Sequence, residues 1–230
     1  MSRGFEPVLF DLDGTVVDTV ELIRRSFRYA TQQVLGRELP DQEILAYVGQ
    51  PLMRQMVQIA PDRAQELYDV YREYNHRIHD ELIASYDGVE VALAALRDGG
   101  RRLGLVTSKS AETTAMAFRA VGLREHFDVV ITASDTTAHK PSPEPLLLCL
   151  QRLATEDRPA VAARAVYVGD SPFDIAAGKA AGMATIAVTW GLFSRQDLLA
   201  AGPDYVVERP GDLVRLCLEG AVSCAGSRCR

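Results

Sequence analysis

Short apolar runs alternate with segments of helical period along most of the chain. Five runs are rich in β-branched and other apolar residues, as strands buried on both faces are. The predicted strands are Val8–Phe10, Leu103–Thr107, Val129–Thr132, Val166–Gly169 and Ala184–Thr189, with a weaker sixth at Tyr205–Val207. Helical spacing is found, for example, in Val89–Leu96, Thr113–Val121, Leu146–Leu153 and Ile175–Ala181. This alternation predicts an α/β fold, a doubly wound parallel sheet with helices on both faces.

One interval is too long for this alternation. Between Asp11 and Thr107 the chain advances 96 residues, whereas one strand–helix–strand unit needs about 30. The surplus contains no predicted strand, and part of it has the apolar spacing of one helix face. The residues on that face are Leu67, Val70, Tyr71, Tyr74, Ile78 and Leu82. We therefore predict a helical cap domain over residues 17–85 (the helical insertion), a core domain over residues 1–16 and 86–219, and a flexible tail over residues 220–230.

Composition excludes several classes of protein. The 230 residues are 47% hydrophobic and 24% charged, close to the globular average, which argues against a disordered or fibrous chain. A protein with a net charge of −6 does not have the excess of basic residues that is typical of a general nucleic-acid binder. Without a membrane-spanning apolar run or a signal peptide, we expect a cytoplasmic protein with no membrane partner. The oligomeric state stays open.

The cysteines do not have the spacing of a zinc site. They are Cys149, Cys217, Cys224 and Cys229, and none forms a Cys-x-x-Cys pair. In a reducing compartment we expect all of them to be free thiols.

Polar side chains gather where the predicted strands end. The carboxyl ends of parallel strands meet at one edge of a sheet, which is where open α/β sheets bind ligands. Three prolines that follow the lysine of this group keep its segment extended. The side chains concerned are Asp11, Asp13, Thr107, Ser108, Lys140, Asp170 and Asp174.

Four carboxylates that converge at one edge need positive charge nearby. Two unit charges about 4 Å apart repel by about 4 kcal/mol at an effective dielectric constant of about 20. A divalent cation together with Lys140 would offset this repulsion, and a ligand set made only of oxygens favours Mg²⁺ over Zn²⁺. A metal ion, an ammonium group and hydroxyls together favour a small phosphorylated substrate.

Two of these carboxylates suit the two roles that phosphoryl transfer needs. Asp11 is ionised at neutral pH, because the reference pKa of aspartate is about 3.9, and it can attack phosphorus without a base. Asp13, kept protonated by its neighbour, could donate a proton to the leaving oxygen and later accept one from water.

Four segments, in this order and spacing, resemble the motifs of the haloacid dehalogenase superfamily over residues 7 to about 190. They are Asp11-Leu12-Asp13-Gly14-Thr15, Thr107-Ser108, Lys140-Pro141 and Gly169-Asp170-Ser171-Pro172-Phe173-Asp174. The resemblance implies a Rossmann-like core with a closing cap. It also implies that Asp11 is the nucleophile and Asp13 the general acid–base. Since true dehalogenases lack the second aspartate, Asp13 favours phosphate chemistry.

The same resemblance implies how the phosphoryl group and the metal are held. Thr107 and Lys140 would bind the phosphoryl group, with Ser108 as a further hydroxyl. Mg²⁺ would be bound by the Asp11 carboxylate, the backbone carbonyl of Asp13 and Asp170, while Asp174 supports them.

Within the superfamily, the helical insertion resembles the phosphoglycolate phosphatase and pyrophosphatase branch. The resemblance lies in Val48-Gly49-Gln50-Pro51-Leu52 and in residues 71–82. Gln50 and Arg54 are candidates for contact with the substrate. His76 lies opposite the apolar stripe and His79 to its side, so we expect both to be solvated or between domains. Lys109 either assists the neighbouring hydroxyls or lies at the surface.

Our principal hypothesis is a Mg²⁺-dependent phosphatase that hydrolyses a phosphomonoester of a small metabolite through an aspartyl phosphate. Phosphoglycolate, a sugar phosphate or a phosphorylated biosynthetic intermediate would suit it. Alternatives with the same nucleophile are an inorganic pyrophosphatase and a sugar-phosphate mutase. A non-catalytic binding module is an alternative of a different class, but it would have no need for a repulsive cluster that costs stability.

Overall fold

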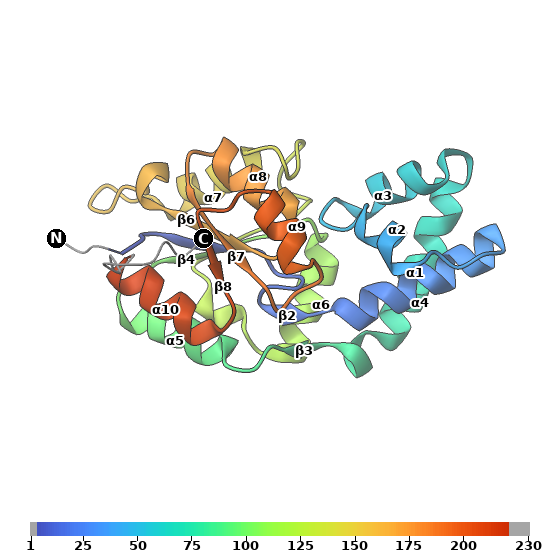
Figure 1. Ribbon diagram of the computed structural model, residues 1–230, viewed down its shortest axis with the longest axis horizontal. Coiled ribbons are helices and arrows are strands. Elements are labelled where there is room, and N and C mark those ends of the chain that lie inside the picture. The colour runs from blue at the N-terminus through green and yellow to red at the C-terminus, as the bar shows by residue number, and fades with distance from the viewer. Residues whose placement is uncertain (1–3, 221–230) are drawn as a thin grey trace.

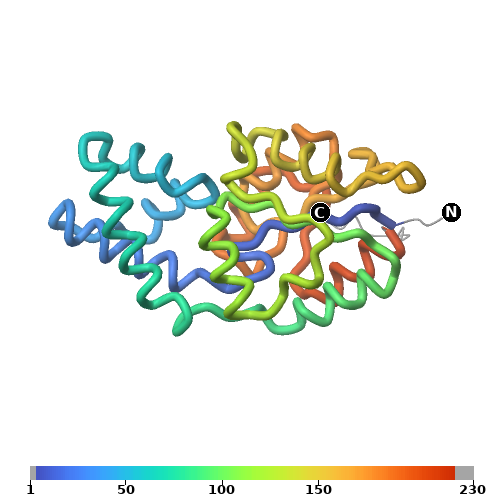
Figure 2. Tube along the Cα trace, turned by 180° about the vertical axis from the view of Figure 1, so that it is seen from behind, coloured from blue at the N-terminus to red at the C-terminus, as the bar shows by residue number. Residues whose placement is uncertain are grey.

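A computed structural model describes residues 4–220 of the chain, and Figures 1 and 2 show it from opposite sides. Six parallel strands form one sheet in the order β5-β4-β1-β6-β7-β8. They are β1 (Val8–Phe10), β4 (Leu103–Val106), β5 (Val129–Ile131), β6 (Val166–Gly169), β7 (Ala184–Val188) and β8 (Tyr205–Val207). Each predicted strand agrees with the structure to within one residue at either end.

Successive residues of the central strand pack on opposite faces of the sheet. Phe10 lies opposite Leu105 of β4 and Val168 of β6, and Val8 and Phe10 belong to one apolar cluster. Leu9, between them, belongs to the cluster on the other face. This alternation follows from the two-residue period of a strand, and it explains why every residue of β1 is buried.

Helices cover both faces of the sheet, which confirms the predicted doubly wound α/β fold (Figure 1). One face carries α5 (Val89–Asp98), α6 (Ala111–Val121) and α10 (Pro210–Glu219). The other carries α7 (Glu144–Leu153), α8 (Pro172–Ala180) and α9 (Arg195–Ala200). The 3-10 turns are η1 (Pro61–Arg63), η2 (Arg124–His126) and η3 (Ala162–Arg164).

The helical insertion lies beyond the carboxyl edge of the sheet and has an apolar cluster of its own (Figure 1). Its helices are α1 (Val20–Leu35), α2 (Asp41–Leu45), α3 (Leu52–Ile59) and α4 (Ala64–Leu82). The long helices α1 and α4 pack together through Phe27 and Tyr71, whose rings meet edge to face at 5.0 Å. The exact division into domains stays a prediction.

Two short strands lie at the ends of the helical insertion. β2 (Val17–Asp18) and β3 (Ala84–Ser85) pair antiparallel, with Val17 opposite Ser85. The expectation that the insertion contains no strand was therefore wrong. Strands of two residues are too short to show a two-residue hydrophobic period.

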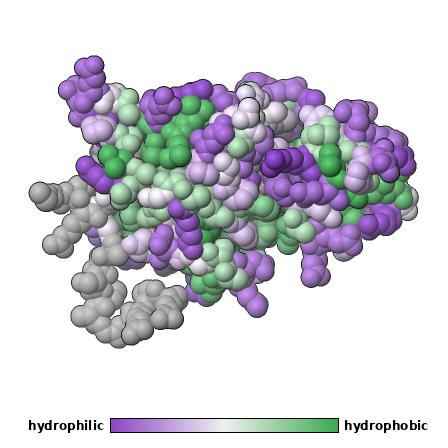
Figure 3. All heavy atoms as spheres, turned by 90° about the horizontal axis from the view of Figure 1, so that it is seen from above, coloured by the Kyte–Doolittle hydropathy of each residue, from purple (hydrophilic) through white to green (hydrophobic). Residues whose placement is uncertain are grey.

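The remaining sequence expectations concern the surface and the thiols. Among residues 4–220, no helix is both long and apolar enough to cross a membrane. Hydrophilic side chains cover much of the face shown in Figure 3, with apolar patches between them. Cys149 and Cys217 are free thiols, as predicted, and both are buried. Cys224, Cys229 and residues 221–230 of the predicted tail lie outside the described residues.

Candidate active site

Polar side chains leave three adjacent strands at the carboxyl edge of the sheet. Asp11 follows β1, Thr107 follows β4 and Asp170 follows β6. The backbone N–H of Asp11 still donates to the Val168 carbonyl at 2.9 Å, so the ladder with β6 holds the aspartate in place. The chain builds one side of the sheet after β1 and the other side from β6 onward. The site therefore lies at the topological switch point.

The ammonium group of Lys140 lies between two buried carboxylates. Its Nζ is 2.9 Å from Asp11 Oδ1 and 2.7 Å from Asp174 Oδ1. It also donates to the Tyr167 hydroxyl at 3.1 Å. Burial of this side chain, which is 2% exposed, lowers its pKa, but the two carboxylates outweigh that effect and raise the pKa of Lys140 above its ordinary value. Lys140 is therefore a fixed positive charge.

Asp174 is held by hydrogen bonds at both carboxylate oxygens. Its Oδ2 accepts from the Ser171 N–H at 3.1 Å and from the Ser171 hydroxyl, and Ser171 Oγ accepts from the Asp174 N–H at 3.2 Å. This reciprocal pair is the capping box that begins α8. Its Oδ1 accepts from Lys140 and lies 3.3 Å from the Tyr167 hydroxyl. Asp174 therefore orients Lys140 and has little capacity left for a further ligand.

The loop after β1 packs directly against Asp170. The φ of Gly14 is +75°, and a Cβ at this position would lie 2.1 Å from Asp170 Oδ2. Only glycine permits both this backbone conformation and this close approach. Asp170 Oδ2 accepts from the Leu192 N–H at 2.7 Å, which fixes the carboxylate against the loop.

Three buried carboxylates share less positive charge than they need. One oxygen from each of Asp11, Asp170 and Asp174 lies within 4.8 Å of the others. Burial, opposed by Lys140 and reinforced by Asp174, raises the pKa of Asp11 to about 7. Burial and the charges of Asp174 and Asp11 raise the pKa of Asp170 well above its usual range. Asp11 Oδ1, although within ion-pair distance of Lys140, has no well-aligned hydrogen bond among the described residues.

This arrangement fits a hard divalent cation. All of the candidate ligands are oxygens, which Mg²⁺ prefers, and a cation would offset the charge that one ammonium group leaves uncompensated. Asp11 and Asp170 have the uncommitted oxygens, whereas those of Asp174 are bonded. The side chain of Asp13 is not a member of this buried group.

The carboxylate of Asp13 accepts hydrogen bonds from two donor side chains. Its Oδ1 accepts from the Thr19 hydroxyl at 2.7 Å and from Lys109 Nζ at 2.6 Å. These two contacts fix one carboxylate oxygen of Asp13, and the proton expected on Asp13 stays a prediction. Lys109 lies inside the site and is not a surface residue, since its side chain is only 14% exposed.

The two predicted phosphate-binding hydroxyls have different environments. Thr107 lines the cavity, and its Oγ1 accepts from the Lys109 N–H at 3.1 Å, so its own proton stays available. The Ser108 hydroxyl instead donates to the Gly49 carbonyl of the helical insertion at 2.8 Å. Because a serine has a single hydroxyl proton, this bond occupies the Ser108 hydroxyl, and a role of Ser108 in phosphate binding stays a prediction.

A cavity of about 230 Å³ extends from Asp11 to the helical insertion. Gln50 lines it, whereas Arg54 is exposed and is not among its lining residues, so contact of either residue with the substrate stays a prediction. His76 lines the cavity and is half-buried. His79 is 1% exposed, with Nδ1 2.6 Å from Asp80 Oδ1. His79 is therefore not solvated, whereas an interdomain position for it stays a prediction.

Gln55 and Asn75 were not predicted as site residues. Both are buried polar residues that line the cavity. A usable signal exists for Asn75, because it and His79 continue the i, i+4 row that begins with the buried Leu67 and Tyr71. A polar residue in the buried row of a helix marks a special environment. Gln55 offers no such signal.

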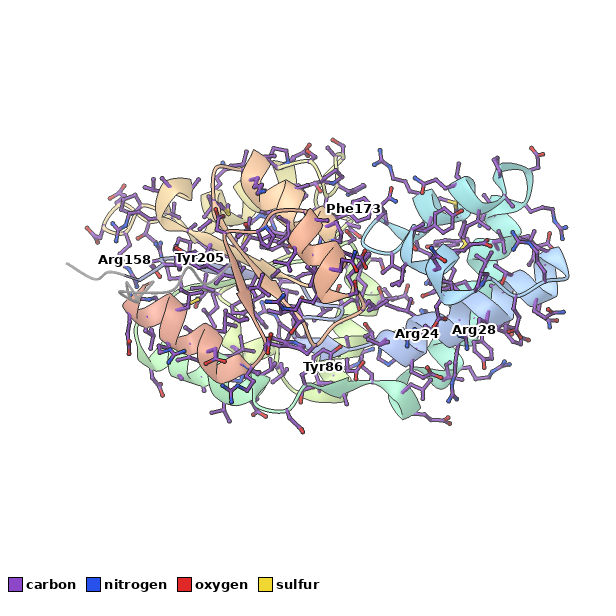
Figure 4. All side chains as sticks on the ribbon, in the orientation of Figure 1. Arg24, Arg28, Tyr86, Arg158, Phe173 and Tyr205 are labelled. Carbon is purple, nitrogen blue, oxygen red and sulfur yellow. The ribbon has the colours of Figure 1, made fainter. Side chains whose placement is uncertain are left out.

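The helical insertion contacts the core around the mouth of the cavity. A Cβ on Gly49 would lie 2.8 Å from the ring of Phe173, at the end of α8 that faces the insertion (Figure 4). Arg72 of α4 forms an ion pair with Glu112 of α6. Together with the bond from Ser108, these contacts hold the insertion over the carboxylates.

Comparison with known proteins gives a family, relatives and a structure of the same fold. Residues 8–188 match the family described as haloacid dehalogenase-like hydrolase. The chain is 36% identical over 209 residues to a protein named pyrophosphatase PpaX from Bacillus velezensis, covering 91% of this chain and 94% of the relative. A pyrophosphatase PpaX from Bacillus cereus is 37% identical over 207 residues, with coverages of 90% and 94%.

The solved structures include a protein described as a predicted phosphatase from Clostridium acetobutylicum. It superimposes with a TM-score of 0.80 at 27% identity, and the match covers 94% of this chain and 99% of that protein. The sheet and the helical insertion therefore belong to one shared architecture.

Proposed function

Because the chain belongs to the haloacid dehalogenase-like hydrolase family, we propose that it is a Mg²⁺-dependent phosphatase that hydrolyses a phosphomonoester of a small metabolite. The observation that carries this proposal is the position of Asp11. Its carboxylate lies 2.9 Å from the fixed charge of Lys140 and lines the cavity that also reaches Asp13 and Thr107. A nucleophile paired with a fixed cation thus faces the same space as two further polar groups.

In the first step, the Asp11 carboxylate attacks phosphorus while the bond from phosphorus to the leaving oxygen breaks. Asp13, protonated at its other carboxylate oxygen, supplies the proton that the leaving oxygen takes, while Lys109 and Thr19 hold it in place through Oδ1. Lys140 and the Thr107 hydroxyl bind the phosphoryl oxygens. The products of this step are the free alcohol and a phosphoryl group on Asp11.

In the second step, Asp13 takes a proton from a water molecule, which attacks phosphorus and restores the Asp11 carboxylate. Inorganic phosphate leaves, so the sum is phosphomonoester plus water giving alcohol plus phosphate. Mg²⁺, held by Asp11 and Asp170 when bound, supplies charge neutralisation for the phosphoryl oxygens. The helical insertion limits the entry of bulk water through its contacts at Ser108 and Glu112.

Phosphate release from a broad panel of phosphomonoesters tests the proposal directly. With Mg²⁺ we expect turnover of p-nitrophenyl phosphate and of at least one metabolite ester, and we expect EDTA to abolish both. Asp11→Asn should remove turnover while the circular dichroism spectrum stays unchanged. Wild-type rates in that variant, or undiminished turnover after complete chelation, would contradict the proposal.

Inorganic pyrophosphatase activity is the second candidate. It is favoured by the name of the relatives, which are 36% and 37% identical and match over nine-tenths of this chain. The same phosphate assay decides between the two functions. An inorganic pyrophosphatase would show a higher kcat/KM for pyrophosphate than for any phosphomonoester.

A further inference from the structure

The cationic side chains that line the cavity are already paired. Lys109 forms an ion pair with Asp13, and Arg72 forms one with Glu112. His76 also lines the cavity, and burial together with the nearby Arg72 lowers its pKa, which keeps it neutral at neutral pH. A second anionic group on the substrate would therefore find no cation without an acidic partner among the cavity-lining side chains that the structure describes.

The side of the cavity formed by the helical insertion is largely apolar. Its lining includes Ile23, Phe27, Val48, Leu52, Met53 and Tyr71. An ionised group placed against such side chains loses its hydration without compensation, which costs several kcal/mol. The leaving group that suits this wall is therefore an apolar one.

The side-chain amide of Gln55 is one of the polar groups that interrupt the apolar wall, together with those of Asn75 and His76. Gln55 of α3 lines the cavity and is 7% exposed. Its Nε2 donates to the Gln50 carbonyl, and this bond fixes the orientation of the amide, because the reverse orientation would place two oxygens in contact. Gln55 Oε1 is shielded from solvent and has no donor among the described residues. A buried acceptor without a donor loses its hydration and gains no hydrogen bond in exchange.

We propose that Gln55 Oε1 accepts a hydrogen bond from an O–H or N–H group of the leaving group. The preferred substrate is then a phosphomonoester whose alcohol has an aliphatic or aromatic body, bears a further hydrogen-bond donor and carries no second anionic group. Pyrophosphate and phosphoglycolate are disfavoured as substrates. Each would place an ionised phosphate or carboxylate beside Gln55 Oε1, and these groups accept hydrogen bonds but have no donor for this oxygen. This inference rests on the proposed phosphatase function.

Matched substrates test the inference on the unmodified enzyme. The panel is cyclohexyl phosphate, the positional isomers of hydroxycyclohexyl phosphate, phosphoglycolate, pyrophosphate and p-nitrophenyl phosphate, each assayed with Mg²⁺. We expect at least one hydroxylated isomer to exceed cyclohexyl phosphate in kcat/KM by about ten- to a hundredfold. We also expect that isomer to exceed phosphoglycolate and pyrophosphate.

A variant of the acceptor completes a double-mutant cycle. Gln55→Met keeps the side-chain length but removes the amide, and Gln65→Met, on the exposed side of α4, is the matched control. We expect Gln55→Met to lower kcat/KM for the preferred hydroxylated isomer about tenfold and to leave that for cyclohexyl phosphate nearly unchanged. The control should change neither. The comparison of substrates on wild type needs no variant, so it stands even if Gln55→Met fails to fold.

The outcomes separate this inference from the proposed function. Three results would overturn the inference. The first is a panel in which no hydroxylated isomer exceeds cyclohexyl phosphate in kcat/KM, and the second is an equal loss of kcat/KM on both substrates in Gln55→Met. The third is a preference for pyrophosphate or phosphoglycolate. Each of these would leave the enzyme a phosphohydrolase. Failure to release phosphate from every compound, p-nitrophenyl phosphate included, would overturn the proposed function itself.

Discussion

Replacement of Lys140 by methionine removes the ammonium group that two buried carboxylates share. In wild type its Nζ lies 2.9 Å from Asp11 and 2.7 Å from Asp174, at a side chain 2% exposed. Loss of one member of a buried ion pair costs about 3–5 kcal/mol, because the remaining charge stays buried without a partner. For a chain of this size, 1 kcal/mol corresponds to about 2–4 °C. We therefore expect the melting temperature of Lys140→Met to fall by about 10 °C at pH 8 in EDTA.

The cost of this substitution depends on pH in a defined direction. Asp11 has a folded-state pKa of about 7, above its ordinary value of 3.8. As pH rises from about 4 to about 7, the unfolded chain loses this proton before the folded protein does, so the contribution of Asp11 to stability falls. Removal of Lys140 takes away the charge that lowers this pKa. The contribution of Asp11 to stability then falls further as pH rises. The difference between wild type and variant should thus be small at pH 4 and grow towards pH 8.

Thermal and urea unfolding, followed by circular dichroism in EDTA, measures both effects. Lys179→Met is the matched control, because Lys179 is an exposed lysine of α8, and it should change stability by less than about 0.5 kcal/mol. A Lys140→Met protein as stable as wild type at pH 8, or a loss that is the same at pH 4 and pH 8, would refute the reasoning.

Three further predictions follow from the same site and from the buried thiols. Asp11→Asn should lower phosphate release by about a thousandfold or more while the melting temperature does not fall, since a repelled carboxylate is removed; a rate within tenfold of wild type would contradict this. Mg²⁺ at about a hundred times its dissociation constant should stabilise the wild-type fold by about 2.7 kcal/mol in thermal unfolding, and an unchanged melting temperature would count against a metal at Asp11 and Asp170. Burial raises the pKa of the Cys149 thiol, and it raises that of Cys217 to about 12. Iodoacetamide at pH 8 should therefore label neither cysteine in the native protein. Peptide mapping that finds either one labelled would show that the core opens.

The sheet could be predicted because its strands are buried on both faces. The runs around Val8 and Val166 are apolar throughout, so their bounds appear in the composition alone. The first turns of the helices were harder to predict. α7 and α8 begin at Glu144 and Pro172, two and three residues before the first apolar residue of the predicted helices, because capping and charge determine these turns.

The site could be predicted only as far as backbone topology determines it. Asp11, Thr107 and Asp170 meet because parallel strands bring their carboxyl ends together. The partners of Ser108 and Asp13 could not be predicted, since they depend on how the helical insertion and Lys109 pack in three dimensions. The same is true of Gln55, whose role depends on one hydrogen bond to the backbone of Gln50.

The covalent state of Asp11 during turnover tests the central claim most directly. The enzyme is mixed with a substrate it hydrolyses, quenched in acid within milliseconds, treated with borohydride and digested for mass spectrometry. Borohydride reduces an aspartyl phosphate to homoserine, so the account predicts homoserine at position 11 in wild type and none in Asp11→Asn. Phosphate release with an unmodified position 11, or with the label on a different residue, would contradict it.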